Sequence, residues 1–192
     1  MSRKILMIAG PNGAGKTTLA RELIACSIEV YEFINADEIA RGLAPMHPET
    51  VALAASKLMI LRMHELLKAG KDFAFETTAS GTNYIKHLKQ AKADGYQIDL
   101  VYVWVASAHH AVERVGQRVR QGGHHVPEEV IIRRYQAGLK NLFAHYMPLA
   151  DQTVIVDNSG QEQKTVAIRR KNGTMKVLEE MTWEKIKRGI NE

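Results

Sequence analysis

The sequence predicts an α/β fold in which a five-stranded parallel sheet is flanked by helices. Two observations predict this class. Short apolar runs alternate with longer segments of helical periodicity, which is the pattern of a parallel sheet wrapped by helices. The first apolar run, residues 5–9, leads directly into a glycine-rich turn and then into a helical segment, so the chain opens as strand, turn and helix.

The glycine-rich turn carries the strongest motif. Residues 10–17 read GPNGAGKT, which fits G-x-x-x-x-G-K-[ST], the phosphate-binding P-loop (Walker A) of nucleotide-binding proteins. Glycines let backbone N–H groups point at a phosphate, and the following helix adds the positive end of its dipole. We expect ATP here, with Mg²⁺ held by the Thr17 hydroxyl and the phosphates reached by Lys16. The predicted nucleotide-binding residues are Gly10, Pro11, Asn12, Gly13, Ala14, Gly15, Lys16, Thr17 and Thr18.

Length and composition limit the possibilities further. A chain of 192 residues with 45% hydrophobic content predicts one domain over residues 1–192. The single cysteine excludes an internal disulfide, and the apolar run near the N-terminus is too short for a signal peptide or a membrane span, so we expect a cytoplasmic protein with no membrane partner. A net charge of +5 suits nucleotides, sugar nucleotides or nucleic acid and does not choose among them.

The remaining elements follow in order along the chain. We predict strands near 4–9, 31–35, 72–77, 97–105 and 152–157, and helices near 16–26, 48–69, 82–94, 108–121 and 127–147. The segments 164–170 and 175–178 flank Asn172-Gly173, a two-residue hairpin signal, so a small C-terminal β-hairpin is expected. A short helix should follow over 182–190.

Ligands of open parallel sheets bind beyond the carboxyl ends of the strands. After the second strand, Asn35 followed by Glu38 resembles a capping box, which would leave Asp37 in the first turn of a short helix. A carboxylate there can accept the proton of an acceptor hydroxyl during phosphoryl transfer. The alternative is an acid that only complements the helix dipole.

The third strand ends in a cluster of polar side chains, Glu76, Thr77, Thr78 and Ser80. This set suits the hydroxyls of a sugar substrate or the shell of a magnesium ion, although Thr78 or Ser80 can also serve as a helix cap. We therefore predict Glu76, Thr77 and Thr78 as substrate-binding residues.

Two arginine-bearing helices follow, joined by a Gly-Gly turn. They resemble a helical lid whose arginines stabilise the transferred phosphoryl group. Arg120 and Arg133 are ranked first and are predicted to be catalytic. Arg118 and Arg134 are ranked second and are predicted to bind the substrate. For each arginine, the alternative is that it belongs to a solvated basic face. The histidine pairs at 109–110 and 124–125 lack carboxylates at metal-ligand spacing, so we predict no metal site there.

The fifth strand ends at Asp157-Asn158-Ser159. Loops at this position usually hold the base in P-loop kinases, so Asn158 is predicted to contact adenine. A simple Asx turn fits these residues equally well.

Taken together, these motifs resemble the zeta toxin family over residues 1 to about 160, with a Gly-Gly-His-x-Val-Pro lid like that of a short branch often labelled as predicted ATPases. The resemblance implies a P-loop kinase that phosphorylates the 3′-hydroxyl of the sugar in UDP-N-acetylglucosamine and is neutralised by an antitoxin protein. It implies Lys16 on the phosphates, Thr17 on magnesium, Asp37 as the base, Glu76 in the substrate site and lid arginines in charge stabilisation.

The sequence therefore predicts an ATP- and Mg²⁺-dependent kinase that phosphorylates a hydroxyl of a small anionic acceptor. Two alternatives remain open. A kinase acting on nucleic-acid ends fits the charge, but only 6% of the residues are aromatic, which argues against nucleic acid as a partner. An ATPase switch without an acceptor would need an acidic residue closing an apolar strand, and the fourth strand runs into Ala106-Ser107 without one.

Overall fold

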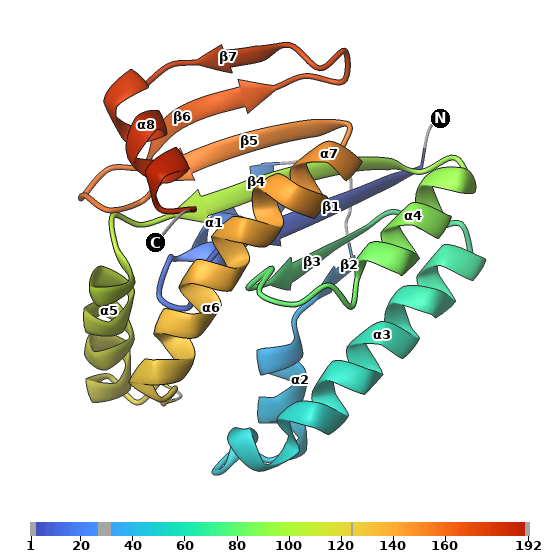
Figure 1. The fold of residues 1–192 in the computed structure, drawn as a ribbon. Helices are drawn as coiled ribbons and strands as arrows, with labels where there is room; N and C mark the ends of the chain where they lie inside the picture. The colour runs from blue at the N-terminus through green and yellow to red at the C-terminus, as the bar shows by residue number, and fades with distance from the viewer. Residues whose placement is uncertain (1–2, 27–31, 124, 191–192) are drawn as a thin grey trace.

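The computed structural model describes residues 3–26, 32–123 and 125–190. His124 of the predicted lid and residue 31 of the predicted second strand lie outside these ranges. The described chain forms one seven-stranded sheet in the order β2-β3-β1-β4-β5-β6-β7 (Figure 1). The strands are β1 Lys4–Ala9, β2 Glu32–Ile34, β3 Phe73–Thr77, β4 Gln97–Trp104, β5 Gln152–Asp157, β6 Lys164–Arg169 and β7 Met175–Val177.

The first five strands are parallel, as predicted, and the C-terminal hairpin continues the same sheet antiparallel to β5. The turn of this hairpin differs from the two-residue turn expected for Asn172-Gly173. The N–H of Gly173 donates to the carbonyl oxygen of Arg170, and the N–H of Arg170 donates to the carbonyl oxygen of Thr174. Gly173 has φ +84° and so occupies the left-handed position that closes a three-residue loop.

The helices connect and cover these strands. They are α1 Lys16–Cys26, α2 Ala36–Leu43, α3 Ala52–Lys68, α4 Ile85–Ala93, α5 Ala108–Arg120, α6 Glu128–Asn141, α7 Met147–Leu149 and α8 Glu180–Arg188. A 3₁₀ turn, η1 Pro48–Val51, precedes α3, and a π-helical turn, η2 Leu142–Tyr146, joins α6 to α7. The helix predicted over 127–147 is therefore interrupted by a π turn, a feature that is frequent at functional sites.

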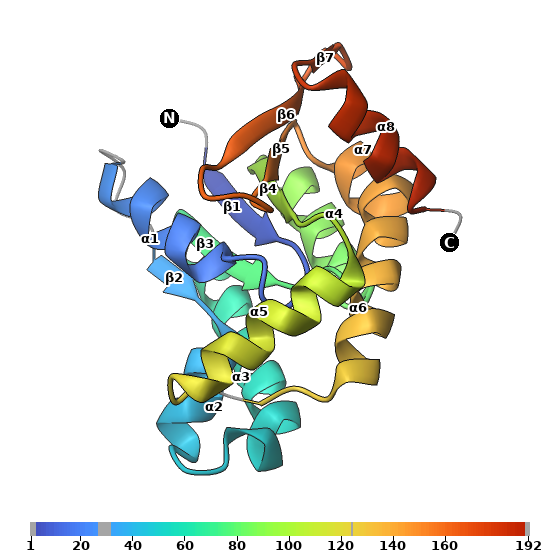
Figure 2. The same ribbon diagram turned by 90° about the vertical axis from the view of Figure 1, so that its left-hand side faces the viewer.

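The two faces of the sheet are covered by different helices, because successive side chains of a strand point to opposite faces. Ile5 and Met7 of β1 pack in a large core with residues of α3, α4, α6 and α8. Ile8 packs on the other face with Leu19 and Ala20 of α1 and with residues of α5 (Figure 2). The parallel strands all end at the edge where the P-loop lies, so this arrangement brings the loops after β1, β2, β3, β4 and β5 together.

In the described ranges, no helix is long and apolar enough to cross a lipid bilayer.

A histidine pair joins α3 to α4 on the surface. His64 Nε2 and His87 Nδ1 lie 2.7 Å apart, and the two rings meet edge to face. A hydrogen bond between these nitrogens needs one donor and one acceptor, so it cannot form when both rings are protonated. Burial, the His64 ring and Lys86 lower the pKa of His87 below its ordinary value.

We expect this pair to make the free energy of unfolding fall on acidification. Since the folded state holds the His87 pKa below that of the unfolded chain, the unfolded chain binds more protons, and stability is lost as the pH falls through about 6.5. The loss should be less than about 1 kcal/mol because the pair is largely solvated. Urea unfolding at pH 7.5 and pH 5.0 measures it, and His87→Gln should show a smaller change; an equal change would exclude the pair as the cause.

Candidate active site

The P-loop is enclosed by two neighbouring segments. Gly13 has φ +77°, and a Cβ there would lie 2.8 Å from the carbonyl oxygen of Ala111 in α5. Gly15 has φ +87°, and a Cβ there would lie 2.5 Å from Asn158 Nδ2 in the loop after β5. Both positions therefore require glycine for their backbone angle and for space. This packing fixes the loop at the N-terminus of α1, the end of a helix that favours phosphate binding.

A buried ion pair lies beside the P-loop. Lys16 Nζ is 3.6 Å from Glu76 Oε1, and the side chains are only 7% and 9% exposed. Lys16 Nζ also donates to the carbonyl oxygen of Pro11 at 2.9 Å, and the Thr17 hydroxyl donates to Glu76 Oε2 at 2.7 Å. Because β3 is the direct neighbour of β1 in the sheet, the acid that closes β3 is brought to the P-loop.

The loop after β2 adds a second carboxylate. Asn35 caps α2, since its Oδ1 accepts the N–H of Asp37 at 2.8 Å, and its Nδ2 donates to Glu76 Oε2 at 2.9 Å. Asp37 thus lies in the first turn of α2, as expected, while Glu38 pairs with Arg41. Within the described ranges, the Asp37 carboxylate has no hydrogen bond or ion pair, so its oxygens are available to a ligand.

Two cavities adjoin at these residues. The P-loop cavity, of about 370 Å³, is lined by P-loop residues, by Asp37 and Glu76, by the α5 side chains Arg114, Gln117 and Arg118, and by Gln121 just after α5. The inner cavity, of about 170 Å³, is bounded by α2, α3, the end of β3 and α6. Lys16, Asp37 and Glu76 line both cavities, so a ligand in each would meet at these three side chains.

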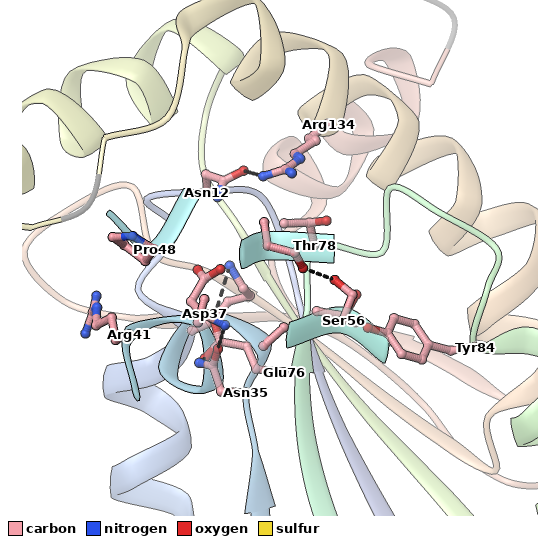
Figure 3. A pocket seen from close by; sticks show the side chains of 15 residues that line it. Asn12, Asn35, Asp37, Arg41, Pro48, Ser56, Glu76, Thr78, Tyr84 and Arg134 are labelled. Carbon is pink, nitrogen blue, oxygen red and sulfur yellow. Dashed lines mark hydrogen bonds and ion pairs between the residues drawn. The ribbon is translucent and has the colours of Figure 1, made fainter. Parts of the chain in front are cut away.

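The inner cavity has a mixed lining (Figure 3). Ser56, Thr78 and Tyr84 are the hydroxyl-bearing residues of this lining, and their hydroxyls bond the Ala52 carbonyl, the Ser80 hydroxyl and the Met59 sulfur. Small side chains on α2 and α3 also line the space. Arg134 of α6 enters from the opposite side, where its Nη1 donates to Asn12 Oδ1 at 3.4 Å. Burial lowers the pKa of Arg134, against the nearby charge of Asp37, and burial raises the pKa of Tyr84. The cavity therefore offers hydroxyl-bearing side chains, the carboxylates of Asp37 and Glu76, and the guanidinium groups of Arg41 and Arg134.

The family model for the zeta toxin matches residues 2–172. The chain belongs to the zeta toxin family. A Haemophilus influenzae protein described as uncharacterized is 30% identical over 135 residues, which are 70% of this chain and 94% of that protein.

Solved structures share the zeta toxin fold at lower identity. A chain of the AvrRxo1-ORF1:AvrRxo1-ORF2 complex with sulphate ions has a TM-score of 0.75 at 18% identity, covering 96% of this chain, and this chain spans only 63% of its length. The same complex with ATP gives 0.74. A chain of the PezAT toxin–antitoxin system of Streptococcus pneumoniae has a TM-score of 0.63 at 14% identity, with 99% and 86% covered. These likenesses confirm the predicted P-loop kinase-like α/β fold.

The lid arginines of this zeta toxin family member differ from the predicted order. Arg118 and Arg134 line the cavities, whereas Arg120 and Arg133 are exposed and line neither. The rotation of α5 is set by its packing on Gly13, which turns Arg114 and Arg118 toward the P-loop. The preference for Arg120 and Arg133 therefore does not fit this geometry.

Asn158 also has a different place from the one expected. Its Nδ2 donates to the carbonyl oxygen of Ala14 at 2.8 Å, its own carbonyl oxygen accepts a hydrogen bond from Arg114, and its side chain is buried. The neighbouring Asp157 accepts the N–H of Ser159, which is the Asx turn that the sequence left open. Asn158 thus braces the P-loop from behind, and it lines none of the described cavities that contain P-loop residues.

Several residues that line the cavities were not among the predicted site residues, including Arg41, Ser56, Tyr84, Arg114 and Gln117. Arg114 lies opposite the valines of its helix, a position that predicts a solvated side chain, so only the packing of α5 on the P-loop brings it to the site. Arg41 and Tyr84 line the inner cavity but belong to no sequence motif, because their positions depend on how α2 and the start of α4 pack. Among the described residues, no three His, Cys, Asp or Glu side chains are grouped as metal ligands.

Proposed function

We propose that this protein is an ATP- and Mg²⁺-dependent kinase that transfers the γ-phosphate to an alcohol group of a small anionic acceptor. The observation that carries the proposal is the meeting of two cavities at Lys16, Asp37 and Glu76. An ATPase switch needs only the cavity that holds its nucleotide. A second, hydroxyl-lined cavity with a free carboxylate at its junction with the first suits a separate acceptor.

The P-loop cavity would hold the triphosphate of ATP, the nucleotide present in the related AvrRxo1 complex. Thr17 and Glu76 supply a hydroxyl and a carboxylate side by side, and hard oxygen donors of this kind fit Mg²⁺. When bound, the ion neutralises phosphate charge. This assigns Glu76 to the metal as well as to the edge of the acceptor site, and Lys16 to the phosphates.

Asp37 is the proposed catalytic base. The acceptor oxygen forms a bond to the γ-phosphorus while the bond from that phosphorus to the bridging oxygen of ADP breaks, and the proton of the acceptor hydroxyl passes to the Asp37 carboxylate. Positioning of the two ligands supplies much of the acceleration, because the transition state is loose and needs little covalent help. Arg134 and Arg118, with Arg114 at the P-loop, would stabilise the charge on the transferred group.

The family implies that the acceptor is UDP-N-acetylglucosamine. The hydroxyl groups of the inner cavity and the guanidinium of Arg134 are consistent with a polyhydroxylated, anionic molecule. The PezAT structure comes from a toxin–antitoxin system, so we also propose an antitoxin partner and a toxic activity for this chain. We place this activity in the cytoplasm, where ATP and sugar nucleotides are available.

Incubation with ATP, Mg²⁺ and UDP-N-acetylglucosamine, followed by mass spectrometry, tests this function. The expected product carries one additional phosphate and is absent with Lys16→Ala and with Asp37→Asn. If ATP binds but no product forms, UDP-N-acetylglucosamine is the wrong acceptor, and other sugar nucleotides and nucleosides must be tried.

The metal assignment gives its own prediction. Glu76→Gln keeps the shape of the side chain and removes its charge, so we expect the Mg²⁺ concentration for half-maximal activity to rise by about 10- to 100-fold. Titration of Mg²⁺ at saturating ATP measures it. Glu113→Gln, which removes an exposed carboxylate of α5 that pairs with His109, is the matched control and should behave as wild type. An unchanged Mg²⁺ requirement in Glu76→Gln would remove Glu76 from the metal site.

A further inference from the structure

The loop between β3 and α4, residues 78–84, supplies one wall of the inner cavity through Thr78, next to Thr77 at the end of β3. Its conformation is unusual. Ala79 has φ +55°, a left-handed backbone conformation that costs a non-glycine residue about 1–2 kcal/mol. Such a conformation persists only when the surrounding structure holds it in place.

The structure that holds this loop is the C-terminal half of α6. A Cβ on Gly138 would lie 2.7 Å from the carbonyl oxygen of Thr78, so helix and loop are in direct backbone contact. Asn141 Nδ2 donates to the carbonyl oxygen of Ala79 at 2.9 Å, and the Tyr146 hydroxyl of the π turn donates to that of Gly81. Three carbonyl groups of one short loop thus face α6 and η2.

The opposite side of the loop faces the cavity. Ala79 N–H donates to Thr77 Oγ1 at 3.1 Å, and the hydroxyls of Thr78 and Ser80 are hydrogen-bonded at 2.8 Å. Thr77 and Thr78 both line the inner cavity. Because the carbonyls are fixed on one side, the orientation of the threonine side chains on the other side is fixed as well.

The same helix carries Arg134. Residues 134, 138 and 141 are spaced by four and three, so they share one helical face over about 10 Å. One face of α6 therefore touches the P-loop side of the site through Arg134 and Asn12 and the acceptor side through Gly138 and Asn141. A shift of α6 would move the Arg134 side chain together with the β3–α4 loop, whereas the P-loop backbone is held separately by α5 and Asn158.

We infer that Gly138 and Asn141 are positioning residues for the acceptor. Through their contacts with the β3–α4 loop, α6 sets the positions of the Thr77 and Thr78 side chains in the inner cavity. Because Arg134 lies on the same helix, the positions of these threonines are coupled to the position of Arg134. The inference rests on the proposed function for the role of the cavity. The mechanical part, that α6 holds the β3–α4 loop, does not depend on which acceptor binds.

Gly138→Ala is the direct test, because its added methyl group must displace the Thr78 carbonyl. Gly42→Ala is the matched control: Gly42 is also helical, and a Cβ there meets nothing within 4 Å. Hydrogen–deuterium exchange read by mass spectrometry should rise in peptides that cover residues 73–84 of Gly138→Ala and stay unchanged over residues 10–18. Gly42→Ala should match wild type in both regions. If Gly138→Ala does not fold, Asn141→Ala, which removes only the side-chain donor, takes its place.

Kinetics give the second measurement, with UDP-N-acetylglucosamine as the probe. We expect the KM for this acceptor to rise by about 10-fold or more in Gly138→Ala, because small displacements of positioning groups are costly, while the KM for ATP changes by less than about 2-fold. Unchanged exchange over residues 73–84, or a rise spread evenly over the chain, would overturn the inference. If wild type does not phosphorylate this probe, the proposed acceptor fails, and the exchange experiment still decides whether α6 holds the loop.

Discussion

Asp37→Asn is expected to lower the rate of phosphoryl transfer by about 10²- to 10⁴-fold, the usual contribution of a general base. Asparagine keeps the size of the side chain but cannot take the proton of an acceptor hydroxyl. Since the Asp37 side chain is exposed and its carboxylate has no hydrogen bond or ion pair within the described ranges, we expect the substitution to leave the fold intact. Steady-state kinetics with each substrate varied, together with a binding titration of ATP, measures the effect.

The dissociation constant for ATP should stay within about 2-fold, because the phosphates are held by the P-loop and Lys16. Asp94→Asn, which removes an exposed carboxylate at the end of α4, is the control for the loss of one negative charge. Full transfer activity in Asp37→Asn would contradict the assignment of the base, and a loss of ATP binding would show that Asp37 acts on the nucleotide instead.

Arg134→Ala should lower kcat by about 10³-fold, the effect typical of an arginine that stabilises the charge of a transferred phosphoryl group. Arg134→Lys should recover little of this loss, because lysine lacks the planar, bidentate fork. The neighbouring Arg133→Ala is a demanding control: it removes the same charge one residue away, but Arg133 is exposed and lines neither cavity. We expect Arg133→Ala to retain at least about half of the activity.

Comparing the two arginine variants shows whether activity depends on the position of the Arg134 side chain or only on the positive charge of the helix. If Arg133→Ala and Arg134→Ala lost activity equally, the lid would act through its overall positive charge or would move much further than the structure indicates. Measurements at low and high salt then distinguish these cases, because a long-range charge effect falls with ionic strength.

The parts of the site that could be predicted from the sequence are those specified by local chemistry. The P-loop is a contiguous motif whose strand, turn and helix follow from neighbouring residues. Asp37 could be placed because Asn35 caps the helix that follows it, and a cap and its first turn are read over three residues. The five parallel strands could be predicted for the same reason, since each is a short apolar run between turn signals.

The arginines could not be ranked from the sequence because their exposure depends on tertiary packing. A helical wheel places Arg114 and Arg118 opposite the apolar face formed by Val112, Val115 and Val119, which predicts that both arginines face solvent. In the structure that helix lies on the P-loop, so part of its polar face lines the P-loop cavity instead of facing solvent. Asn158 is a similar case: its role as a brace depends on the backbone of Ala14, 144 residues away.

Strand order explains how Glu76 comes to lie beside the P-loop. The fourth predicted strand runs into Ala106-Ser107 and has no acid at its end. The sheet places β3 beside β1 on one side and β4 on the other, and it is β3 that ends in the acid. Adjacency in a parallel sheet is set by crossover connections, so no local pattern could show which strand delivers its last residues to Thr17 and Lys16.

The measurement that tests the central claim most directly is the fate of the γ-phosphate. Wild type and Asp37→Asn would be incubated with γ-labelled ATP, Mg²⁺ and separate small-molecule and RNA fractions of a bacterial extract. We predict label in an organic molecule of the small-molecule fraction with wild type and its loss in Asp37→Asn. Label confined to RNA ends would contradict the small acceptor, and label released only as inorganic phosphate would contradict phosphoryl transfer to an acceptor altogether.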